Sequence, residues 1–319
     1  MNKIRVGIVG YGNLGHALEE TILNEPNLCL VGIFSKRKNI SSSHGTPVFE
    51  KNMINYFEGK IDVLALCSGS KSDMLVDAPD LARHFDIINT FDTHELIPLE
   101  LEKLNKISKQ AGTLAVVSAG WDPGLFSCAR AVFFSCLGVT PTCFWGKGTS
   151  LGHSEAAKSV DGVLDAVSLT IPNKKTLKLA KRGLATAAPK HSRKVYVLAA
   201  PNEDKKQIEQ KIKNIKHYFA EQPTTVKFVN KRQLEQIKSF SHAGKVVATK
   251  TTEDGFKCNL TLDISMDSNP SLTAMMIASH LRVWHKLKTK FKNGALTPLH
   301  IAPLDLLETD EMSSIKNFM

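Results

Sequence analysis

Short hydrophobic stretches separated by amphipathic segments run through the first 120 residues of this chain. Stretches that read as strands buried on both faces of a parallel sheet occur at 4–9, 29–34, 61–66, 86–90 and 113–118. Leu14, Leu18 and Ile22 recur at helical spacing after the first stretch. A further helix is predicted to begin at Pro98 and to stop at Gly112. This alternation predicts an α/β domain built on a parallel sheet.

The pattern changes after about residue 120. A lysine-rich helix is predicted over 203–219, and one long helix over 270–290 with Asn269 as its cap. Strand candidates occur at 166–171, 195–199, 225–229 and 257–264. We therefore expect a first domain over 1–120, to which 291–319 returns, and a second α+β domain over 121–290 with a mixed or largely antiparallel sheet.

A glycine turn lies between the first strand and the first helix. Residues 10–15 read Gly-Tyr-Gly-Asn-Leu-Gly, the G-x-G-x-x-G spacing of a dinucleotide-binding turn. The first glycine permits the turn, the second lets a pyrophosphate approach the backbone, and the third lets helix and strand pack closely. The free N–H groups of the following helix would meet the phosphates. A strand before and a helix after favour a Rossmann domain over a purely structural turn.

The end of the second strand distinguishes NADP from NAD. An NAD enzyme usually has an Asp or Glu there to hold the ribose 2′-hydroxyl, whereas this chain has Ser35, Lys36 and Arg37. A hydroxyl and two cations suit a 2′-phosphate, which a carboxylate would repel. The alternative is a solvated basic loop. We predict NADP as the cofactor.

Polar and acidic residues follow the other strands of the first half. In an open α/β sheet, ligands bind at the carboxyl ends of the strands, so these residues are expected at the same edge as the glycine turn. A substrate role is favoured for Asp92 and Asp122, although the Asp-Pro-Gly sequence at 122–124 could be a bare turn. The further cofactor contacts expected from these loops and the glycine turn are Gly10, Tyr11, Gly12, Asn13, Leu14, Ser68, Gly69, Ser70, Lys71, Thr90, Phe91 and Asp92.

Composition agrees with an enzyme acting on small anionic molecules. The 319 residues include 42% hydrophobic and 23% charged residues, with a formal net charge of +10. The lysines spread over helices without interleaved aromatics, which argues against nucleic-acid binding. No stretch approaches a membrane span, and the polar start leads directly into a strand, leaving no room for a signal peptide. Six cysteines without C-x-x-C pairs indicate reduced thiols, a cytoplasmic location and no metal site.

Beyond these patterns, the chain resembles the meso-diaminopimelate D-dehydrogenases over nearly its whole length. The glycine turn, Phe-Ser-Lys-Arg at 34–37 and Thr-Phe-Asp-Thr-His at 90–94 carry the resemblance. Gly-Trp-Asp-Pro-Gly-Leu-Phe-Ser at 120–127, Phe-Trp-Gly at 144–146 and Gly-His-Ser at 152–154 carry it as well. The Gly-Trp-Asp-Pro-Gly and Phe-Trp-Gly elements are far more specific than the glycine turn. Family members are homodimers that use NADP to deaminate the D-centre of meso-2,6-diaminopimelate reversibly, giving L-2-amino-6-oxopimelate and ammonia. They have a Rossmann domain and a substrate and dimerisation region.

The resemblance also implies roles for individual residues. Asp92 and Asp122 would hold the amine of the reacting D-centre, with Trp121 and Trp145 shaping the pocket. Thr170, Arg193 and His242 would bind the carboxylate of the L-centre. Asn269 would be a further substrate contact, and the backbone at Leu151 and Gly152 would receive a carboxylate. From the residues alone, structural roles are favoured for Thr170, His242 and Asn269, as a strand residue, a loop histidine and a helix cap.

Three positions depart from the family pattern. The chain has Lys36 where an arginine is common, Leu151 where a polar amide is common, and Ser-His-Ala-Gly at 241–244 where Pro-His-Gly-Gly is common. Lysine keeps the charge of arginine but loses its bidentate fork.

The sequence leaves two alternative functions open. The protein could be another two-domain NADP-dependent amino-acid or aldehyde dehydrogenase, or a non-catalytic NADP-binding sensor.

Overall fold

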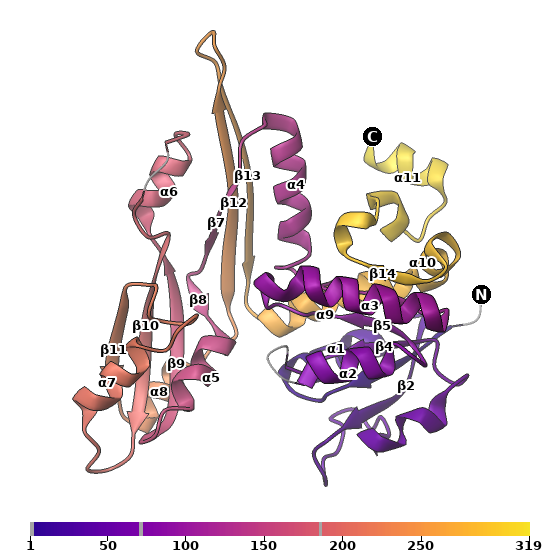
Figure 1. Ribbon diagram of the computed structural model, residues 1–319, viewed down its shortest axis with the longest axis horizontal. Helices are drawn as coiled ribbons and strands as arrows, with labels where there is room; N and C mark the ends of the chain where they lie inside the picture. Colours follow the sequence, from indigo (N-terminus) through magenta and orange to yellow (C-terminus); the bar gives the residue numbers. More distant parts are fainter. Residues whose placement is uncertain (1–2, 70–72, 185–186) are drawn as a thin grey trace. The chain divides into compact units, whose positions relative to one another are not determined.

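The computed structural model describes residues 3–69, 73–184 and 187–319, and it divides into two units (Figure 1). Unit 1 comprises Met1–Cys128 and Pro270–Met319, and unit 2 comprises Ala129–Asn269. Ser70 and Lys71, predicted above as cofactor contacts, lie outside the described residues. No helix in the described part of the chain is long and apolar enough to cross a membrane.

Unit 1 is built on a seven-stranded parallel sheet with the order β14-β6-β5-β4-β1-β2-β3. The chain moves from β1 to β2 and β3 on one side, and β4, β5 and β6 follow on the other side. The order therefore reverses between β1 and β4, which is where ligands bind in such sheets. The predicted Rossmann domain is confirmed. Its strands are β1 (Ile4–Val9), β2 (Leu28–Ser35), β3 (Val48–Glu50), β4 (Val63–Leu66), β5 (Asp86–Asn89), β6 (Leu114–Val116) and β14 (Gly294–Leu296).

Two hydrophobic clusters cover the two faces of this sheet. Alternating side chains of β1 point to opposite faces, so Ile8 belongs to one cluster and Val9 to the other. Helices α1 (Asn13–Leu23), α9 (Asn269–Arg282) and α10 (Trp284–Phe291) pack in the cluster with Ile8. Helices α2 (Asp73–Leu81) and α3 (Ile97–Ala111) pack in the cluster with Val9. Gly112 ends α3 in the left-handed conformation, as predicted.

The helical segment from residue 269 onward differs from the prediction. It is not one helix, because Val283, with φ −106°, interrupts it between α9 and α10. It also belongs to unit 1, whereas the sequence pattern assigned residues 270–290 to the second domain. The physical reason is burial: Ile277 and Leu281 of α9 and Trp284 of α10 pack with Leu18 of α1. Helix α11 (Glu311–Phe318) completes the unit.

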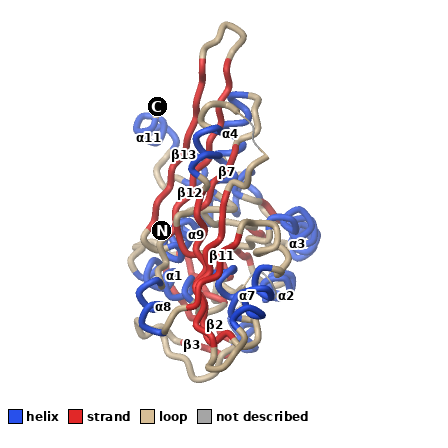
Figure 2. Tube along the Cα trace, turned by 90° about the vertical axis from the view of Figure 1, so that its left-hand side faces the viewer, coloured by secondary structure: helices blue, strands red, loops and turns tan. Residues whose placement is uncertain are grey.

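Unit 2 contains two sheets, and the long β12–β13 hairpin of one of them is visible in Figure 2. The first has the order β11-β10-β9-β8, in which β10 and β11 are parallel and the other pairs antiparallel. The second, β13-β12-β7, is antiparallel. The prediction of mixed and antiparallel pairing is confirmed, but β7, β8 and β12 were not anticipated. The strands are β7 (Thr142–Trp145), β8 (Gly148–Thr149), β9 (Val163–Pro172), β10 (His191–Ala199), β11 (Thr224–Phe228), β12 (His242–Thr251) and β13 (Lys257–Met266).

The helices of unit 2 are short. Helix α7 (Lys205–Lys213) covers only half of the predicted helix at 203–219, although Ile215 and Phe219 beyond it still pack in the core of the first sheet. A positive φ of 66° at His217 interrupts the predicted periodicity. The others are α5 (Leu151–Lys158), α6 (Lys174–Ala180) and α8 (Lys231–Ile237), and α4 (Leu125–Leu137) leads from unit 1 into unit 2.

A pair of substitutions in α9 tests whether this helix stabilises the Rossmann core. Ile277 is fully buried, so Ile277→Ala should lower the free energy of unfolding by about 2–5 kcal/mol. The matched control is Met275→Ala in the same helix, because Met275 is 54% exposed. We expect it to change the free energy by less than ~0.5 kcal/mol. Urea titrations of both variants give the measurement, and equal losses would contradict the assignment of α9 to this core.

Candidate active site

The glycine turn joins β1 to α1 by close backbone contact. Gly10 has φ 92°, and a side chain at Gly15 would place its Cβ 2.4 Å from the Gly10 oxygen. Around Gly12, by contrast, a Cβ would meet no atom within 4 Å. Helix α1 begins after Gly12 without a side-chain cap, so its first N–H groups remain available to an anion. The turn therefore has both the room and the donors that a pyrophosphate needs.

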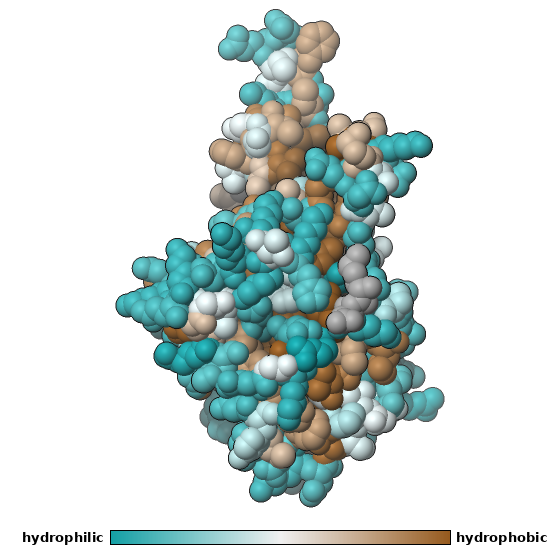
Figure 3. Space-filling view, turned by 90° about the vertical axis from the view of Figure 1, so that its right-hand side faces the viewer, coloured by the Kyte–Doolittle hydropathy of each residue, from teal (hydrophilic) through white to brown (hydrophobic). Residues whose placement is uncertain are grey.

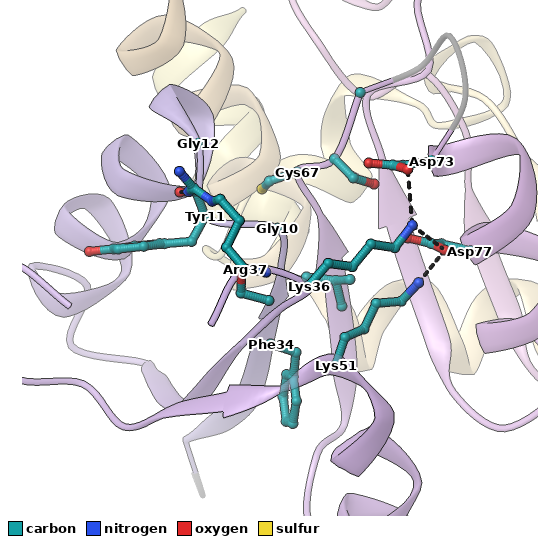
Figure 4. Close-up of a pocket in the computed structure, with 14 residues that line it drawn as sticks. Gly10, Tyr11, Gly12, Phe34, Lys36, Arg37, Lys51, Cys67, Asp73 and Asp77 are labelled. Atoms are coloured by element: carbon teal, nitrogen blue, oxygen red, sulfur yellow. Dashed lines mark hydrogen bonds and ion pairs between the residues drawn. The ribbon is translucent and has the colours of Figure 1, made fainter. Parts of the chain in front are cut away.

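A cavity of about 260 Å³ lies beside this turn, at the carboxyl ends of β1, β2 and β4 (Figure 4). Eight of the predicted cofactor contacts line it. The lining comprises Val9, Gly10, Tyr11, Gly12, Phe34, Ser35, Lys36, Arg37, Lys51, Cys67, Ser68, Gly69, Asp73 and Asp77. Asn13, Leu14, Thr90, Phe91 and Asp92 do not line this cavity, and their contact with a cofactor stays a prediction.

Charged side chains occupy the end of β2. The guanidinium of Arg37 donates to the backbone oxygen of Tyr11. The backbone N–H of Arg37 donates to Ser35 Oγ at 3.0 Å. The ammonium of Lys36 lies 2.9 Å from Asp73 and 3.7 Å from Asp77. Lys51, from the 3₁₀ helix that follows β3, forms an ion pair with the same Asp77 oxygen. Figure 4 shows both lysines pointing toward Asp77 and Arg37 toward Tyr11.

The side chain of Tyr11 is structural, although its backbone borders the cavity. Its hydroxyl donates to Glu19, accepts the Ser43 N–H at 3.0 Å, and is buried. Burial of Glu19 favours its neutral form, but hydrogen bonds from Ser42, Thr46 and Tyr11 outweigh this and lower its pKa. The network ties α1 to the segment between β2 and β3, and so holds the cation-bearing end of β2 beside the glycine turn.

The loops that carry the two candidate catalytic aspartates are joined by Asn89. Asn89 Oδ1 accepts the N–H groups of Phe91 and Ser118, each at 3.1 Å, and its backbone oxygen accepts the Ala119 N–H at 2.8 Å. Ser118 Oγ donates in turn to the Phe91 oxygen at 2.7 Å. These bonds fix the ends of β5 and β6 together, immediately before Asp92 and before Trp121. Asp92 is exposed and Asp122 is half-buried.

The residues around Trp121 form a tight loop. A side chain at Gly124, which has φ 134°, would place its Cβ 1.9 Å from the Gly120 oxygen, so only glycine fits. The ring of Trp121 packs edge-on against Phe126 at 5.2 Å and is 6% exposed. Trp121 therefore stabilises the loop that presents Asp122, and its predicted contact with a substrate stays a prediction.

In unit 2, Thr170 of β9, Arg193 of β10 and His242 of β12 come together around β8. Arg193 and Thr170 are register partners, and the Arg193 guanidinium donates to the Thr170 hydroxyl. Gly148 also pairs with Thr170, and a Cβ there would lie 2.4 Å from the Cα of His242. Nε of Arg193 is buried and has no hydrogen-bond partner among the described residues. Burial lowers the Arg193 pKa to about 10, which leaves the group cationic and in need of an anion.

Two histidines beside Arg193 were not predicted as site residues. Burial and the Arg193 charge lower the pKa of His153 to about 3 and that of His191 to about 4. Both are therefore neutral near pH 7. His191 Nε2 accepts the N–H of Trp145 at 2.8 Å, and Ser150 Oγ lies 2.8 Å from His153 Nδ1. Because both histidines are neutral, neither adds a positive charge beside Arg193, whose guanidinium has the donors to bind a carboxylate.

The remaining predicted substrate contacts belong to the same unit. Trp145 is the last residue of β7, and its ring lies 5.0 Å from His191. Leu151 and Gly152 open α5, whose start lacks a side-chain cap. Asn269 is the last residue of unit 2, and its N–H donates to Phe240, two residues before His242. Their roles toward a substrate stay predictions.

Comparison with known proteins identifies the family. Residues 120–268 match the family described as "Diaminopimelic acid dehydrogenase C-terminal domain". The meso-diaminopimelate D-dehydrogenase of Ureibacillus thermosphaericus is 36% identical over 315 residues, 96% of each chain, and that of Corynebacterium glutamicum is 36% identical over 308 residues, 95% of each.

This chain belongs to the meso-diaminopimelate D-dehydrogenase family.

Solved structures of such enzymes have the same fold. The Corynebacterium glutamicum diaminopimelate dehydrogenase in complex with diaminopimelate is 34% identical, with a TM-score of 0.94 and 100% of both chains covered. An engineered D-amino acid dehydrogenase bound to NADP⁺ is 33% identical, with a TM-score of 0.91 and the same coverage.

Sequence reasoning singled out the candidate cations and aspartates but missed the residues that hold them in place. Asn89 and Ser118 fix the two aspartate loops, and His153 and His191 surround Arg193. Lys51 and Asp77 form an ion pair between segments that are distant in sequence. The Gly-His-Ser motif at 152–154 was a signal for His153, but nothing local distinguishes Asn89 or Lys51 from ordinary surface-loop residues.

The buried histidines predict an acid-sensitive unit 2 in this diaminopimelate dehydrogenase family member. Because the folded-state pKa of His191 is about 4 against 6.5 for an ordinary histidine, the unfolded chain binds more protons between these values. Stability is therefore lost as the pH falls through this window, by roughly 1–2 kcal/mol at about pH 5. Gln at position 191 does not titrate, so His191→Gln should reduce the difference between urea titrations at about pH 7 and about pH 5.

The control for this experiment is His84→Gln, because His84 is exposed and its neighbour Glu58 is exposed as well. It should leave the pH dependence of stability close to that of the wild type. A His191→Gln variant whose stability falls with acid as steeply as that of the wild type would contradict the assignment.

Proposed function

We propose that this protein is an NADP-dependent meso-diaminopimelate D-dehydrogenase. It oxidises the D-centre of meso-2,6-diaminopimelate to L-2-amino-6-oxopimelate and releases ammonia, in a reversible reaction of lysine and diaminopimelate biosynthesis. Full-length membership in a family of that activity supports the proposal. The geometric observation that carries it is the buried guanidinium of Arg193, which lies beside Thr170 with one N–H unpartnered among the described residues. A substrate with a second, distant carboxylate would supply the acceptor and the negative charge that this guanidinium lacks.

The unit 1 cavity fits NADP, whose bound nicotinamide accepts the hydride from the substrate. The open space at Gly12 and the uncapped start of α1 suit the pyrophosphate. Ser35, Lys36 and Arg37 suit a 2′-phosphate, because they combine a hydroxyl with two cations where an NAD enzyme has a carboxylate.

Asp92 and Asp122 hold the amine of the D-centre in this proposal. Two carboxylates bind an ammonium strongly and can accept its proton as the carbon–nitrogen bond is oxidised. They also disfavour a keto acid, because without an amine the carboxylates would lose their partners. Asn89 and Ser118 are positioning residues, since their hydrogen bonds fix the loops that carry both aspartates.

Thr170, Arg193 and His242 bind the carboxylate of the L-centre, with Asn269 and the backbone at Leu151 and Gly152 as further contacts. The cation of Arg193 neutralises the carboxylate, and the neutral state of His153 and His191 prevents the site from collecting further anions. Trp145 forms an apolar wall, and its N–H to His191 hydrogen bond keeps it in place.

We further propose that the enzyme is a cytoplasmic homodimer. Of the thirteen residues of α4, only Phe126 is buried, and Val132 and Phe134 are 57% and 54% exposed. Figure 3 shows hydrophobic side chains in the upper part of that view, at the height of α4 and the β12–β13 hairpin in Figure 1. Covering such a helix by a second copy would remove these side chains from water. The free cysteines are consistent with a reducing compartment.

Substitution of Arg37 tests the choice of cofactor. Arg37→Ala should raise the KM for NADP by about tenfold, because it removes a charge-assisted contact to the 2′-phosphate. The KM for NAD should remain nearly unchanged. Lys38→Ala is the control, since Lys38 is the next residue and does not line the cavity. An equal increase of the KM for NADP and of the KM for NAD would show that Arg37 does not contact the 2′-phosphate.

Neutralising the aspartates tests the chemistry. Asp92→Asn and Asp122→Asn change charge at nearly constant shape, so the fold should persist. We expect kcat/KM for meso-diaminopimelate with NADP to fall by at least ~10²-fold in at least one of them. Asp80→Asn, on the exposed side of α2, is the matched control and should retain wild-type rates. Wild-type rates in both candidate variants would exclude the assignment.

The distant carboxylate is tested at Arg193. Arg193→Ala should lower kcat/KM for meso-diaminopimelate by about 10- to 150-fold, the size of one lost charge-assisted anchor. Rates with simple D-amino acids, which lack this carboxylate, should change much less. The exposed Arg232 provides the control Arg232→Ala. An equal loss with both kinds of substrate would favour a broader amino-acid dehydrogenase that does not bind a second carboxylate.

A further inference from the structure

The cofactor cavity contains a cation that the sequence did not single out. Lys51 follows β3, and β3 pairs with β2 so that Ser35 is opposite Glu50. Lys51, the residue after Glu50, therefore lies beside the end of β2 that carries Lys36 and Arg37. The Lys51 side chain lines the cavity together with Ser35, Lys36 and Arg37, and it is 22% exposed.

Charge balance indicates that Lys51 is needed there. Among the described residues that line the cavity, Lys36 and Arg37 are accompanied by the carboxylates of Asp73 and Asp77. These two cations and two anions would cancel. Lys51 is the third cation and supplies the excess positive charge of this lining. A 2′-phosphate carries nearly two negative charges, so it would gain little from a balanced set.

The ion pair with Asp77 fixes the position of Lys51. Asp77 is 2% exposed and accepts from Lys51, with Lys36 3.7 Å away (Figure 4). The buried carboxylate of Asp77 holds the Lys51 ammonium firmly, because without that ammonium the negative charge of Asp77 would be buried and uncompensated. An ammonium has three N–H donors, so Lys51 can bind Asp77 and a phosphate oxygen at the same time.

We propose that Lys51 is a specificity-determining residue of this dehydrogenase: its ammonium, anchored by Asp77, binds the 2′-phosphate of NADP beside Ser35, Lys36 and Arg37. This rests on the cofactor assigned under the proposed function. The lysine at position 36, where an arginine is common in the family, loses the bidentate fork, and Lys51 provides an additional donor at the same group. Asp77 acts through Lys51 as a positioning residue.

Binding of nucleotide fragments tests this without turnover. Calorimetry with adenosine 2′,5′-bisphosphate and with adenosine 5′-monophosphate isolates the contribution of the 2′-phosphate. Lys51→Met should weaken binding of the bisphosphate by about tenfold and change that of the monophosphate by less than about twofold. Lys51→Arg, which keeps the charge, should restore most of the affinity. Lys60→Met is the matched control, because Lys60 lies over Phe57 and does not line the cavity.

A second variant covers the case in which Lys51→Met unfolds the chain by leaving Asp77 uncompensated. Lys51→Met with Asp77→Asn removes both charges together and keeps the excess of one positive charge in the lining. It should still bind the bisphosphate more weakly than the wild type, because the direct contact of the Lys51 ammonium with the 2′-phosphate is lost. Wild-type affinity in this double variant, or equal losses for both nucleotides in Lys51→Met, would overturn the proposal. Lys51-dependent bisphosphate binding in a protein that fails to oxidise diaminopimelate would contradict the proposed reaction and leave this inference intact.

Discussion

The close backbone contact between Gly10 and Gly15 is the constraint on which the cofactor site depends. It brings the start of α1 against the end of β1, and a single methyl group at Gly15 would place a carbon 2.4 Å from the Gly10 oxygen. The uncapped N–H groups of α1 then lie at the point where the strand order reverses, beside the end of β2. The hydrogen-bond network around Tyr11 and Glu19 holds the following segment, so the cations of β2 have a fixed place relative to the turn. The backbone of the sheet and the turn thus determines where a phosphate can bind. The side chains at the end of β2 determine whether the site suits the 2′-phosphate of NADP.

Each unit contains a cation, buried or partly buried, to which we assign a role in ligand binding. In unit 2, Arg193 is buried among neutral histidines and lacks a partner for Nε among the described residues, so a carboxylate is the group that completes it. In unit 1, Lys51 is partly buried, forms an ion pair with the buried Asp77, and retains donors for a second anion. In both cases the fold bears the cost of desolvating a cation, and a ligand of matching charge offsets that cost.

The sequence predicted the first half of the fold well because its strands are continuous hydrophobic runs, and β1 has the predicted bounds Ile4–Val9. It also predicted the stop of α3, since Gly112 adopts the left-handed conformation that favours glycine. It missed β12, whose sequence His242–Thr251 includes Gly244 and two lysines and lacks a clear alternation. It missed the break at Val283, because Leu281, Trp284 and Leu287 stay buried across it. The pairs Lys51–Asp77 and Arg193–Thr170 could not be read from local sequence. Sheet register brings Arg193 opposite Thr170, whereas the ion pair of Lys51 and Asp77 joins the 3₁₀ helix after β3 to α2.

The central claim of the proposed function is that the substrate combines a D-configured amine centre, which is oxidised, with a distant L-configured centre, which is bound through its carboxylate. The most direct measurement is the initial rate of NADPH formation with separated meso-, LL- and DD-diaminopimelate. The account predicts the highest kcat/KM with the meso isomer. The LL-isomer presents the wrong hydrogen at the reacting carbon, and the DD-isomer misplaces the amine of its distant centre. Oxidation of the LL-isomer as fast as the meso isomer would contradict the account.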